Sequence, residues 1–449
     1  MTQPTKQTIS RRHWLRRTAG AGTAAAALPL IAPASALGLA GATAPSERIG
    51  LGVIGTGSKA NGGTRNFLGL GDAVEARAFC DPNDRVRQAA VNRHAPDAQT
   101  AFQTRDFREL LDRDDVDAVL IATPDHWHAA QAIAAARAGK HVFCEKPLSN
   151  TIAEGRAVVR AVEQANVVFQ HGTQLKSMQG TRRACELVRN GMIGELKAVR
   201  VGSPPGHAFG YPDPEPVPDW LDWNMWQGPA PEAPYQSVRI GPIPGRGLRG
   251  WYFIRDYSKA GWIAGHGVHD IDIAQWALGL EETGPVEIEG EGKFPETGLF
   301  DTVLTYQLEF RYANGTTIHM ADTGRNRHGV TFEGSEGTVF TRGGLETTPK
   351  ELANYQPGPD DVQLYDSRHH EGNFIECIRT GRPTITPAEL AHRSTSTCLL
   401  GGIAVQLGRK LRWHPQEERF LDDDQANRLL SYAPRSSEGL SFGPGGALR

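Results

Sequence analysis

Short apolar runs separated by polar stretches of helical length fill the first part of the chain after about residue 45. The apolar runs lie at 48–54, 74–80, 116–123, 141–145 and 167–173. Runs that are apolar throughout are typical of parallel strands buried on both faces. The stretches between them, at 83–94, 105–112, 127–139 and 151–164, are predicted to be helices. This alternation predicts a doubly wound parallel sheet with helices on both faces.

The pattern changes after about residue 172. Residues 203–250 are rich in Pro, Gly and Trp, and we expect a long ordered loop region there. Alternating apolar and polar positions then predict strands at 286–292, 303–312, 316–321, 329–333 and 338–341. Asn314-Gly315 is a strong hairpin turn signal between two of them, and 368–410 has a helical pattern. The second half is therefore predicted to be an α+β domain with an open, mostly antiparallel sheet.

The first forty-four residues differ in composition from the rest. The segment 10–16, SRRHWLR, resembles a twin-arginine export signal, and an Ala-rich apolar stretch follows it. Ala34-Ser35-Ala36 and Ala42-Thr43-Ala44 are candidate cleavage sites. An uncleaved membrane anchor is the alternative, but Pro29, Pro33 and many Ala and Gly residues disfavour a spanning helix. We expect a processed protein that is periplasmic or secreted, without a stable membrane span.

These patterns divide the chain into four parts. They are a signal peptide at 1–44, a dinucleotide-binding domain at 45–172, a substrate and oligomerisation domain at 173–410, and a tail at 411–449 that packs back on the body. Beyond the signal, 43 Lys and Arg residues stand against 51 Asp and Glu residues, without a basic stripe. This mild acidity argues against nucleic acid as a partner. The five scattered cysteines are interpreted as buried thiols, and no metal site is expected.

A glycine-rich loop follows the first predicted strand directly. It reads Gly55-Thr56-Gly57-Ser58-Lys59-Ala60, a GxGxx(G/A) pattern that lets the backbone approach a pyrophosphate at a helix N-terminus. Asp81 ends the second strand about twenty residues on, where an acid binds the adenosine ribose hydroxyls. That acid would repel a 2′-phosphate, so NAD is favoured over NADP, although Arg85 lies nearby. The sequence predicts a Rossmann domain that binds NAD.

Three further motifs follow in order along the chain: Thr123-Pro124-Asp125-His126-Trp127-His128, Glu145-Lys146-Pro147, and Gly267-Val268-His269-Asp270-Ile271-Asp272. Together with the glycine loop and Asp81 they resemble the Gfo/Idh/MocA family of oxidoreductases over the whole mature chain. The segments WNMWQGP at 223–229, Asp256-Tyr257-Ser258 and Asn373-Phe374 are similar to a branch of that family that often bears export signals. The resemblance implies substrate binding between a Rossmann domain and an open antiparallel sheet.

The resemblance also implies roles for individual residues. Lys146 would contact the nicotinamide ribose and a substrate hydroxyl, and His269 would handle the proton, as a histidine near pKa 6.5 can. Cofactor contacts are expected from Thr123, Pro124, His126, His128 and Glu145, and substrate contacts from Gln174, Asp256, Asp270 and Asp272. The alternatives are a surface cation at Lys146 and a helix-capping or packing role for His269. His126 and His128 resemble a metal pair, but residues at i and i+2 do not share a helix face.

One position departs from the family pattern. Where many members have an Asp four residues before the histidine, this chain has Gly265, followed by His266. Tyr257, Asp256 or His266 could fill the missing role. His266-Gly267 also resembles a segment of family 109 glycosidases, which use NAD without net redox change. We therefore expect a sugar or polyol oxidoreductase with tightly held NAD, acting as a homo-oligomer. The alternatives are a redox-neutral glycosidase and a non-catalytic periplasmic sugar binder.

Overall fold

A six-stranded parallel sheet forms the first half of the protein, in a computed structural model that describes residues 47–95 and 101–436. Its strands are β1 (Ile49–Ile54), β2 (Val74–Cys80), β3 (Phe102–Thr104), β4 (Ala118–Ile121), β5 (His141–Cys144) and β6 (Phe169–His171). They follow the order β3-β2-β1-β4-β5-β6, as in a doubly wound sheet. β1 and β4 are buried along their whole length, which explains their uninterrupted apolar sequences.

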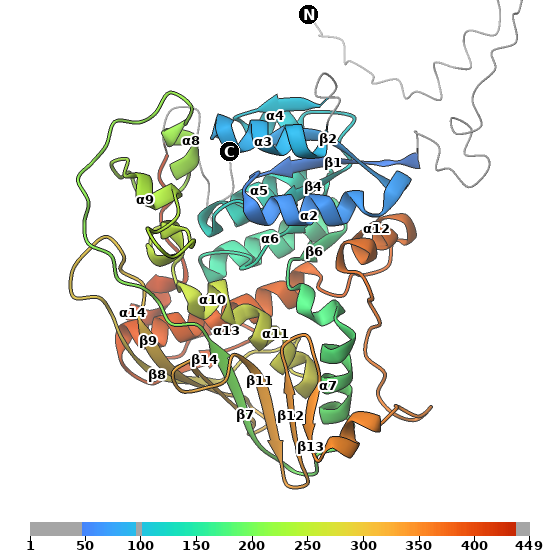
Figure 1. The fold of residues 1–449 in the computed structure, drawn as a ribbon. Coiled ribbons are helices and arrows are strands. Elements are labelled where there is room, and N and C mark those ends of the chain that lie inside the picture. The colour runs from blue at the N-terminus through green and yellow to red at the C-terminus, as the bar shows by residue number, and fades with distance from the viewer. Residues whose placement is uncertain (1–46, 96–100, 437–449) are drawn as a thin grey trace, which may run out of the picture. The chain divides into compact units, whose positions relative to one another are not determined.

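Helices cover both faces of this sheet (Figure 1). They are α2 (Ser58–Leu68), α3 (Asp84–His94), α4 (Phe107–Leu111), α5 (Asp125–Arg137) and α6 (Ile152–Ala165). Asn83 caps α3 by accepting from two backbone amides, and Thr151 with Glu154 forms a capping box on α6. The predicted Rossmann arrangement is confirmed. The short edge strand β3 was not predicted, because its Phe-Gln-Thr sequence carries no run of apolar residues.

The second half is built on a nine-stranded sheet with the order β13-β12-β11-β7-β10-β9-β8-β14-β15. Its first strands are β7 (Leu196–Ser203), β8 (Glu287–Lys293), β9 (Thr305–Arg311), β10 (Thr317–Asp322) and β11 (Gly329–Gly334). The others are β12 (Thr338–Thr341), β13 (Glu346–Thr348), β14 (Leu411–His414) and β15 (Arg419–Phe420). Only the β7–β10 pair is parallel, so the predicted mostly antiparallel sheet is confirmed. Because β14 pairs with β8, the sheet continues beyond residue 410.

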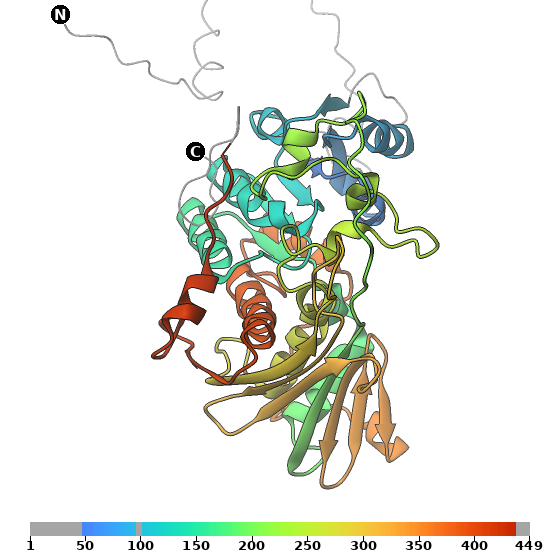
Figure 2. The ribbon, with the colours of Figure 1, turned by 90° about the vertical axis from the view of Figure 1, so that its left-hand side faces the viewer.

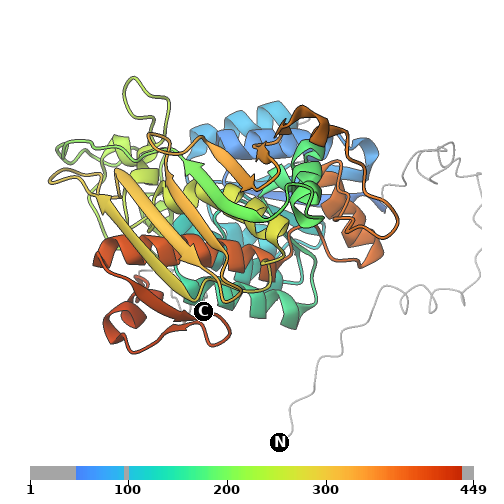
Figure 3. The same ribbon diagram turned by 90° about the horizontal axis from the view of Figure 1, so that it is seen from below.

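Helices cover one face of the nine-stranded sheet. Figure 3 looks onto the other face, with α13 (Ala388–Leu407) behind the strands. α7 (Gln179–Arg189), α10 (Trp262–Gly265) and α11 (Gly267–Leu278) complete the helical layer, and the short 3-10 turn η5 (Gln174–Ser177) precedes α7. Val199, Leu308 and Phe310 of the strands pack against this layer in one continuous core. The open face carries charged pairs such as Arg200–Glu333 at 2.8 Å.

Residues 204–261 connect β7 to α10 within the second half and run alongside the Rossmann domain (Figure 2). As predicted, most of this segment is irregular, with only α8 (Trp223–Gln227), α9 (Ser237–Ile240) and the 3-10 turn η6 (Gly250–Phe253) as regular elements. Its aromatic side chains form a core of their own around Trp223, Trp226 and Phe253. The Trp220 carbonyl accepts from the Asp84 amide, and the Asp222 amide donates to Pro82, so the segment is fixed to the start of α3.

The C-terminal part returns to both halves. α12 (His370–Thr380) packs on the Rossmann domain, where Phe374 contacts Phe67 and Phe143. α14 (Asp424–Asn427) and the turn η8 (Arg428–Leu430) follow the last strand. The chain then reaches α8, where Arg435 donates to the carbonyls of Asn224, Gly228 and Ala230. The signal-peptide prediction and residues 437–449 of the predicted tail lie outside the described residues. No helix in the described part is both long and apolar enough to cross a membrane.

Candidate active site

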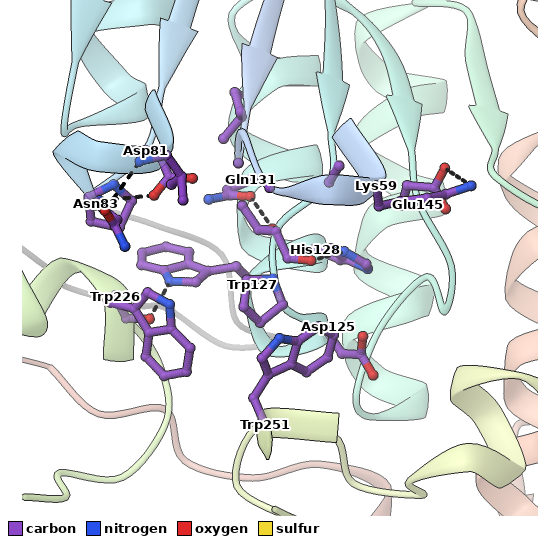
Figure 4. Close-up of a pocket in the computed structure, with 18 of the residues that line it drawn as sticks. Lys59, Asp81, Asn83, Asp125, Trp127, His128, Gln131, Glu145, Trp226 and Trp251 are labelled. Carbon is purple, nitrogen blue, oxygen red and sulfur yellow. Dashed lines mark hydrogen bonds and ion pairs between the residues drawn. The ribbon is translucent and has the colours of Figure 1, made fainter. Parts of the chain in front are cut away.

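A cavity of about 1120 Å³ lies at the carboxyl ends of β1, β2, β4 and β5. Ligands of doubly wound folds bind at this edge. The Rossmann domain lines it with the glycine loop, the Asp81 region and the residues from Thr123 to Gln131 (Figure 4). The connecting segment supplies the opposite wall through Met225, Trp226, Ile240, Arg249, Trp251 and Tyr252. The cavity is therefore enclosed by both halves of the chain.

The glycine loop fits the close approach of a ligand. Gly55 has φ +79°, and a Cβ there would lie 2.8 Å from the Thr123 amide, so only glycine is tolerated. An added Cβ at Gly57 would meet no atom within 4 Å, and Gly57 lines the cavity, so its surface is open for a ligand. No side chain caps α2, whose first amides start at this loop. Ala60 is buried in the core, as the third position of the motif requires.

Asp81 ties the glycine loop to the next strand. Its Oδ2 accepts from the Thr56 amide at 2.8 Å and from Thr56 Oγ1 at 3.1 Å, and its Oδ1 accepts from the Asn83 amide at 2.9 Å. Burial raises the pKa of Asp81. Arg85 lies over the Trp220 ring at 4.4 Å and does not line the cavity. The acidic residue thus faces the cavity while the nearby arginine is held on its rim.

Lys146 occupies the other end of the cavity. Its Nζ donates to the Gly265 carbonyl at 2.7 Å and lies 6.0 Å from the Tyr252 ring centre. Burial lowers the pKa of Lys146, with Glu145 and Asp125 acting in the opposite direction. The position that lacks the family's Asp therefore still contacts the lysine, through its backbone oxygen.

Lys59, Glu145 and Gln174 meet beside Lys146. Lys59 Nζ lies 3.1 Å from Glu145 Oε1. With the Gln174 amide oriented to satisfy both neighbours, its oxygen accepts from Lys59 Nζ at 2.6 Å and its nitrogen donates to Gly172. The structure thus brings three predicted site residues from the glycine loop, β5 and η5 together at one point.

The TPDHWH motif lies at the floor of the cavity. His128 links the motif to the Lys146–Pro147 turn, with Nδ1 2.6 Å from the Pro147 carbonyl and Nε2 2.9 Å from the Thr123 carbonyl. Asp125 Oδ2 accepts from Ser258 Oγ at 2.7 Å, while its buried Oδ1 has no partner among the described residues. Burial raises the pKa of Asp125. His128 therefore holds the Lys146–Pro147 turn, and Asp125 offers a carboxylate oxygen to the cavity.

His126 points away from the cavity. Its Nε2 lies 3.1 Å from the Trp226 carbonyl, and burial lowers its pKa to about 3. Trp127 Nε1 donates to the same carbonyl at 3.0 Å. These contacts anchor α8 over α5, so His126 positions the wall of the cavity without lining it.

His266 and His269 lie at the start of α11 near Lys146. Nδ1 of each ring is buried without a partner among the described residues. Burial lowers the pKa of both, to about 3 for His266, and the positive charge of Lys146 adds to this effect. Both imidazoles are therefore neutral near pH 7, with polar atoms unsatisfied in a buried place. Such atoms are rare in proteins without a functional reason.

Four predicted site residues lie apart from the Lys146 end. The Tyr257 hydroxyl accepts from Arg239 at 3.2 Å inside the aromatic core. Asp256 lines neither the dinucleotide cavity nor a neighbouring one. Asp272 pairs with Lys176 at 3.0 Å, and Asp270 pairs with Arg342 at 3.3 Å. Tyr252, five residues before Tyr257, is the tyrosine that reaches Lys146.

Of the wall contributed by the connecting segment, sequence reasoning singled out none of Met225, Ile240, Arg249 and Tyr252. Trp251 and Tyr252 stack on each other at 3.7 Å and line the cavity opposite the glycine loop. Gln131, which accepts from Thr123 Oγ1 at 2.8 Å, and Arg105 were missed as well. The repeated tryptophans were the one available signal. In residues 47–95 and 101–436 no three His, Cys, Asp or Glu side chains gather as metal ligands would, and all five cysteines are buried thiols.

The fold and cavity define a two-domain protein built on a dinucleotide-binding domain. Two family models match the chain: the oxidoreductase family's NAD-binding Rossmann fold at residues 49–173, and its C-terminal alpha/beta domain at residues 181–438. The chain therefore belongs to the Gfo/Idh/MocA family of oxidoreductases, and its first domain is an NAD-binding Rossmann fold.

The chain is similar to curated members with different activities. It is 32% identical over 204 residues to a glycosyl hydrolase family 109 protein of Shewanella pealeana, covering 42% of this chain and 44% of that protein. It is 28% identical over 263 residues to levoglucosan dehydrogenase of Pseudarthrobacter phenanthrenivorans, covering 53% and 58%. The solved structure of levoglucosan dehydrogenase with NADH and levoglucosan has a TM-score of 0.60 at 18% identity, over 81% of this chain and 99% of that one. The chain thus spans less than half the length of the first relative, and the structural likeness concerns the fold.

Proposed function

We propose that this protein is an NAD-dependent oxidoreductase that acts on a hydroxyl of a sugar, polyol or glycoside. The observation that carries the proposal is the position of Lys146. Its Nζ is held by the Gly265 carbonyl at the end of the dinucleotide cavity, and its charge acts on His269, whose buried Nδ1 has no partner among the described residues. Membership of the family and the levoglucosan dehydrogenase relative support the same substrate class.

The residues around the cavity fit a dinucleotide. Gly57 and the uncapped start of α2 suit a pyrophosphate, because Gly57 lines the cavity with open space around it, while the Gly55 and Thr56 amides already donate to Cys80 and Asp81. Asp81 suits ribose hydroxyls, and the placement of Arg85 on Trp220, outside the cavity, favours NAD over NADP. Lys59, Thr123, Pro124, His128 and Glu145 complete the lining. When bound, NAD would supply the hydride acceptor.

The residues beyond the glycine loop would handle the proton. A substrate hydroxyl placed between Lys146 and His269 would be polarised by the ammonium group and would lose its proton to the neutral imidazole. The Gly265 carbonyl fixes the direction of Lys146 Nζ, so a backbone oxygen does the positioning that a carboxylate does in many relatives. Trp251 and Tyr252 offer flat aromatic surface beside this point, which suits the apolar face of a sugar ring.

The test begins with the cofactor. We expect purified protein, after denaturation, to release near-stoichiometric NAD detectable by absorbance and mass. We also expect a panel of sugars and polyols to include substrates that reduce the bound nicotinamide. Protein that binds no nicotinamide and oxidises no member of a broad panel would overturn the proposal.

A redox-neutral glycosidase is the second candidate. The observation that favours it is the match to family 109 glycosyl hydrolases, together with His266 beside His269. Release of nitrophenol from nitrophenyl glycosides, lost when NAD is stripped and restored when it is added back, would support this route. If no nitrophenol is released from any of the common nitrophenyl glycosides, net dehydrogenation remains the proposed reaction.

We further propose export through the twin-arginine pathway and assembly into a homo-oligomer. The SRRHWLR segment and the Ala-rich stretch after it support export. Replacing Arg11 and Arg12 together by Lys should retain the protein in the cytoplasm when cell fractions are compared. The open face of the nine-stranded sheet is the surface we propose for assembly, and light scattering of the processed protein would measure its mass.

A further inference from the structure

A second, open cavity of about 1060 Å³ lies where η5, the residues before β11 and the β12–β13 turn meet. It is lined by Leu175, Arg327, His328, Phe340, Arg342 and their neighbours. Leu175 follows Gln174, which contacts Lys59, so the cavity adjoins the Lys146 end of the dinucleotide cavity. His328 and His266 lie with their rings 6.1 Å apart, which joins this cavity to the α11 histidines.

Nitrogen atoms dominate the polar groups at this junction. His266 Nδ1 and His328 Nε2 are buried without partners among the described residues. The Arg342 guanidinium, with a quarter of its side chain exposed, makes one ion pair, with Asp270. Asp270 does not line the cavity, and the carboxylate that does, Glu346, pairs with Arg327 at the exposed rim. Hydrogen-bond donors at this junction therefore outnumber the acceptors available to them.

The positive character of this place also appears in its histidines. Burial lowers the pKa of His266 to about 3, and the positive charges of Lys146 and Arg342 contribute to a smaller extent. Burial and Arg342 lower the pKa of His328 to about 4. Both rings are thus neutral near pH 7, and each keeps one N–H to donate. An anion at this place would be met by Arg342, which Asp270 contacts from the other side, and by one N–H from each ring.

We infer that the substrate carries an anionic group, a carboxylate or a phosphate, that binds to Arg342 with His266 and His328. This inference rests on the proposed function, since it names the class of sugar that the oxidoreductase takes. Hydrogen bonds with an ionised partner are about twice as strong as neutral ones, so a neutral sugar would use this site poorly. The dinucleotide pyrophosphate is not the intended anion, because Arg342 and His328 do not line the dinucleotide cavity.

The experiment compares matched ligands on the NAD-loaded protein. The protein is titrated with glucose, glucuronate and glucose 6-phosphate, and then with galactose, galacturonate and galactose 6-phosphate. Intrinsic tryptophan fluorescence and the heat of binding are recorded. We expect wild-type protein to bind one anionic class at least about tenfold more tightly than the neutral sugar, the scale of one charge-assisted bond. The anion is identified by whichever of glucuronate and glucose 6-phosphate binds more tightly.

Two arginines provide the matched variants. Arg342→Gln should remove the preference for the anionic sugar while the NAD content is unchanged, and Arg342→Lys should restore part of it. Arg327→Gln is the control, because Arg327 lines the same cavity but pairs with Glu346 and stacks on Phe340 at 3.4 Å. It should keep the wild-type preference.

The outcomes separate the two claims. Neutral sugars that bind as tightly as anionic ones, or an Arg342→Gln variant that keeps the preference, would overturn the inference and leave the oxidoreductase standing. A loss of preference in Arg327→Gln equal to that in Arg342→Gln would also overturn it. Protein that lacks nicotinamide would overturn the proposed function. Absence of binding by all three ligand classes would overturn the inference, and the nicotinamide content and the sugar panel would decide the proposed function separately.

Discussion

At the scale of single residues, the site depends on a backbone atom where relatives use a side chain. Gly265 offers no functional group, yet its carbonyl lies 2.7 Å from Lys146 Nζ. A Cβ at position 265 would lie 3.2 Å from Trp262, so the helix turn α10 packs closely here. The lysine is therefore positioned by the path of the main chain from α10 into α11, and its charge balance comes from Asp125 and Glu145.

Removing Lys146 or His269 tests the proton-handling roles. We expect Lys146→Met and His269→Ala each to lower turnover by at least about a hundredfold, the usual scale for a positioned acid–base group. Bound NAD should stay near the wild-type amount for His269→Ala. Lys140→Met is the matched control, because Lys140 precedes β5 at the amino ends of the strands, where its Nζ donates to the Arg113 carbonyl. Near-normal activity of both site variants would show that these two residues do not carry the chemistry.

Asp270 should make stability depend on pH. Burial raises its pKa from 3.8 to about 7, against the lowering effect of Arg342. Between these values the unfolded chain has lost the proton while the folded protein keeps it, so stability falls as pH rises through this window. The full shift corresponds to about 4 kcal/mol at most. Asp270→Asn should lose this dependence, so the variant gains stability relative to wild type between pH 4 and pH 8 in urea unfolding. Parallel curves for the two proteins would contradict the shifted pKa.

At the scale of elements, the β1–α2 turn contains one glycine that the backbone requires and another that only ligand binding requires. Gly55 is needed for the backbone, since its φ is +79° and its surroundings leave no room for a Cβ. Gly57 has an ordinary φ of −68° and open space around it. Its lack of a side chain therefore benefits only a ligand that approaches the turn.

Gly57→Ala should weaken NAD binding without unfolding the protein. The added methyl group enters the cavity at the pyrophosphate position, and we expect at least about tenfold weaker NAD binding with a stability change of a few tenths of a kcal/mol. Gly62→Ala, in the middle of α2, is the control, because it also meets open space but lies outside the cavity. It should bind NAD normally and gain up to about 1 kcal/mol of stability. Titration with NAD, followed by fluorescence quenching, measures the affinity of both variants. Unchanged affinity in Gly57→Ala would place the pyrophosphate elsewhere.

Elements whose sequence matches their burial could be predicted, and the rest could not. β1 and β4 are apolar throughout and buried on both faces, so their pattern was sufficient. β7 was not predicted, although it lies at the centre of the second sheet. Val199 and Val201 are buried there while Lys197 and Arg200 are exposed, and this alternation covers too few residues to stand out. Short apolar alternation becomes a strand only once neighbouring strands pair with it.

The same limit applies to the site. The motifs led to Gly55, Asp81, Lys146 and the α11 histidines because their spacing is local. Tyr252 and Arg342 reach the Lys146 region through folding over long sequence separations, and no pattern at those positions marks them. A carbonyl such as that of Gly265 has no sequence signal at all.

At the scale of the whole molecule, ligand binding and domain association are linked. The residues from Arg48 onward belong to one compact unit. Trp226, Trp251 and Tyr252 from the connecting segment line the same cavity as the glycine loop. Two hydrogen bonds join the halves beside this cavity: Lys146 Nζ donates to the Gly265 carbonyl at 2.7 Å, and Ser258 Oγ donates to Asp125 at 2.7 Å. Separating the halves would break both bonds.

NAD should therefore stabilise both halves together. A ligand that binds only the folded state adds RT ln(1 + [L]/Kd), about 2.7 kcal/mol at a hundred times Kd. In calorimetry of stripped and reloaded protein, we expect a single unfolding transition that moves to higher temperature with NAD. The unfolding temperature of Gly57→Ala should rise less at the same NAD concentration, which separates specific binding from a general salt effect.

If the domains unfolded in two steps and NAD raised the temperature of only one step, the wall formed by the connecting segment would not hold the cofactor. Because that segment closes the cavity through Trp226, Trp251 and Tyr252, cofactor release should require its displacement, and the gain in stability should be shared by the whole unit.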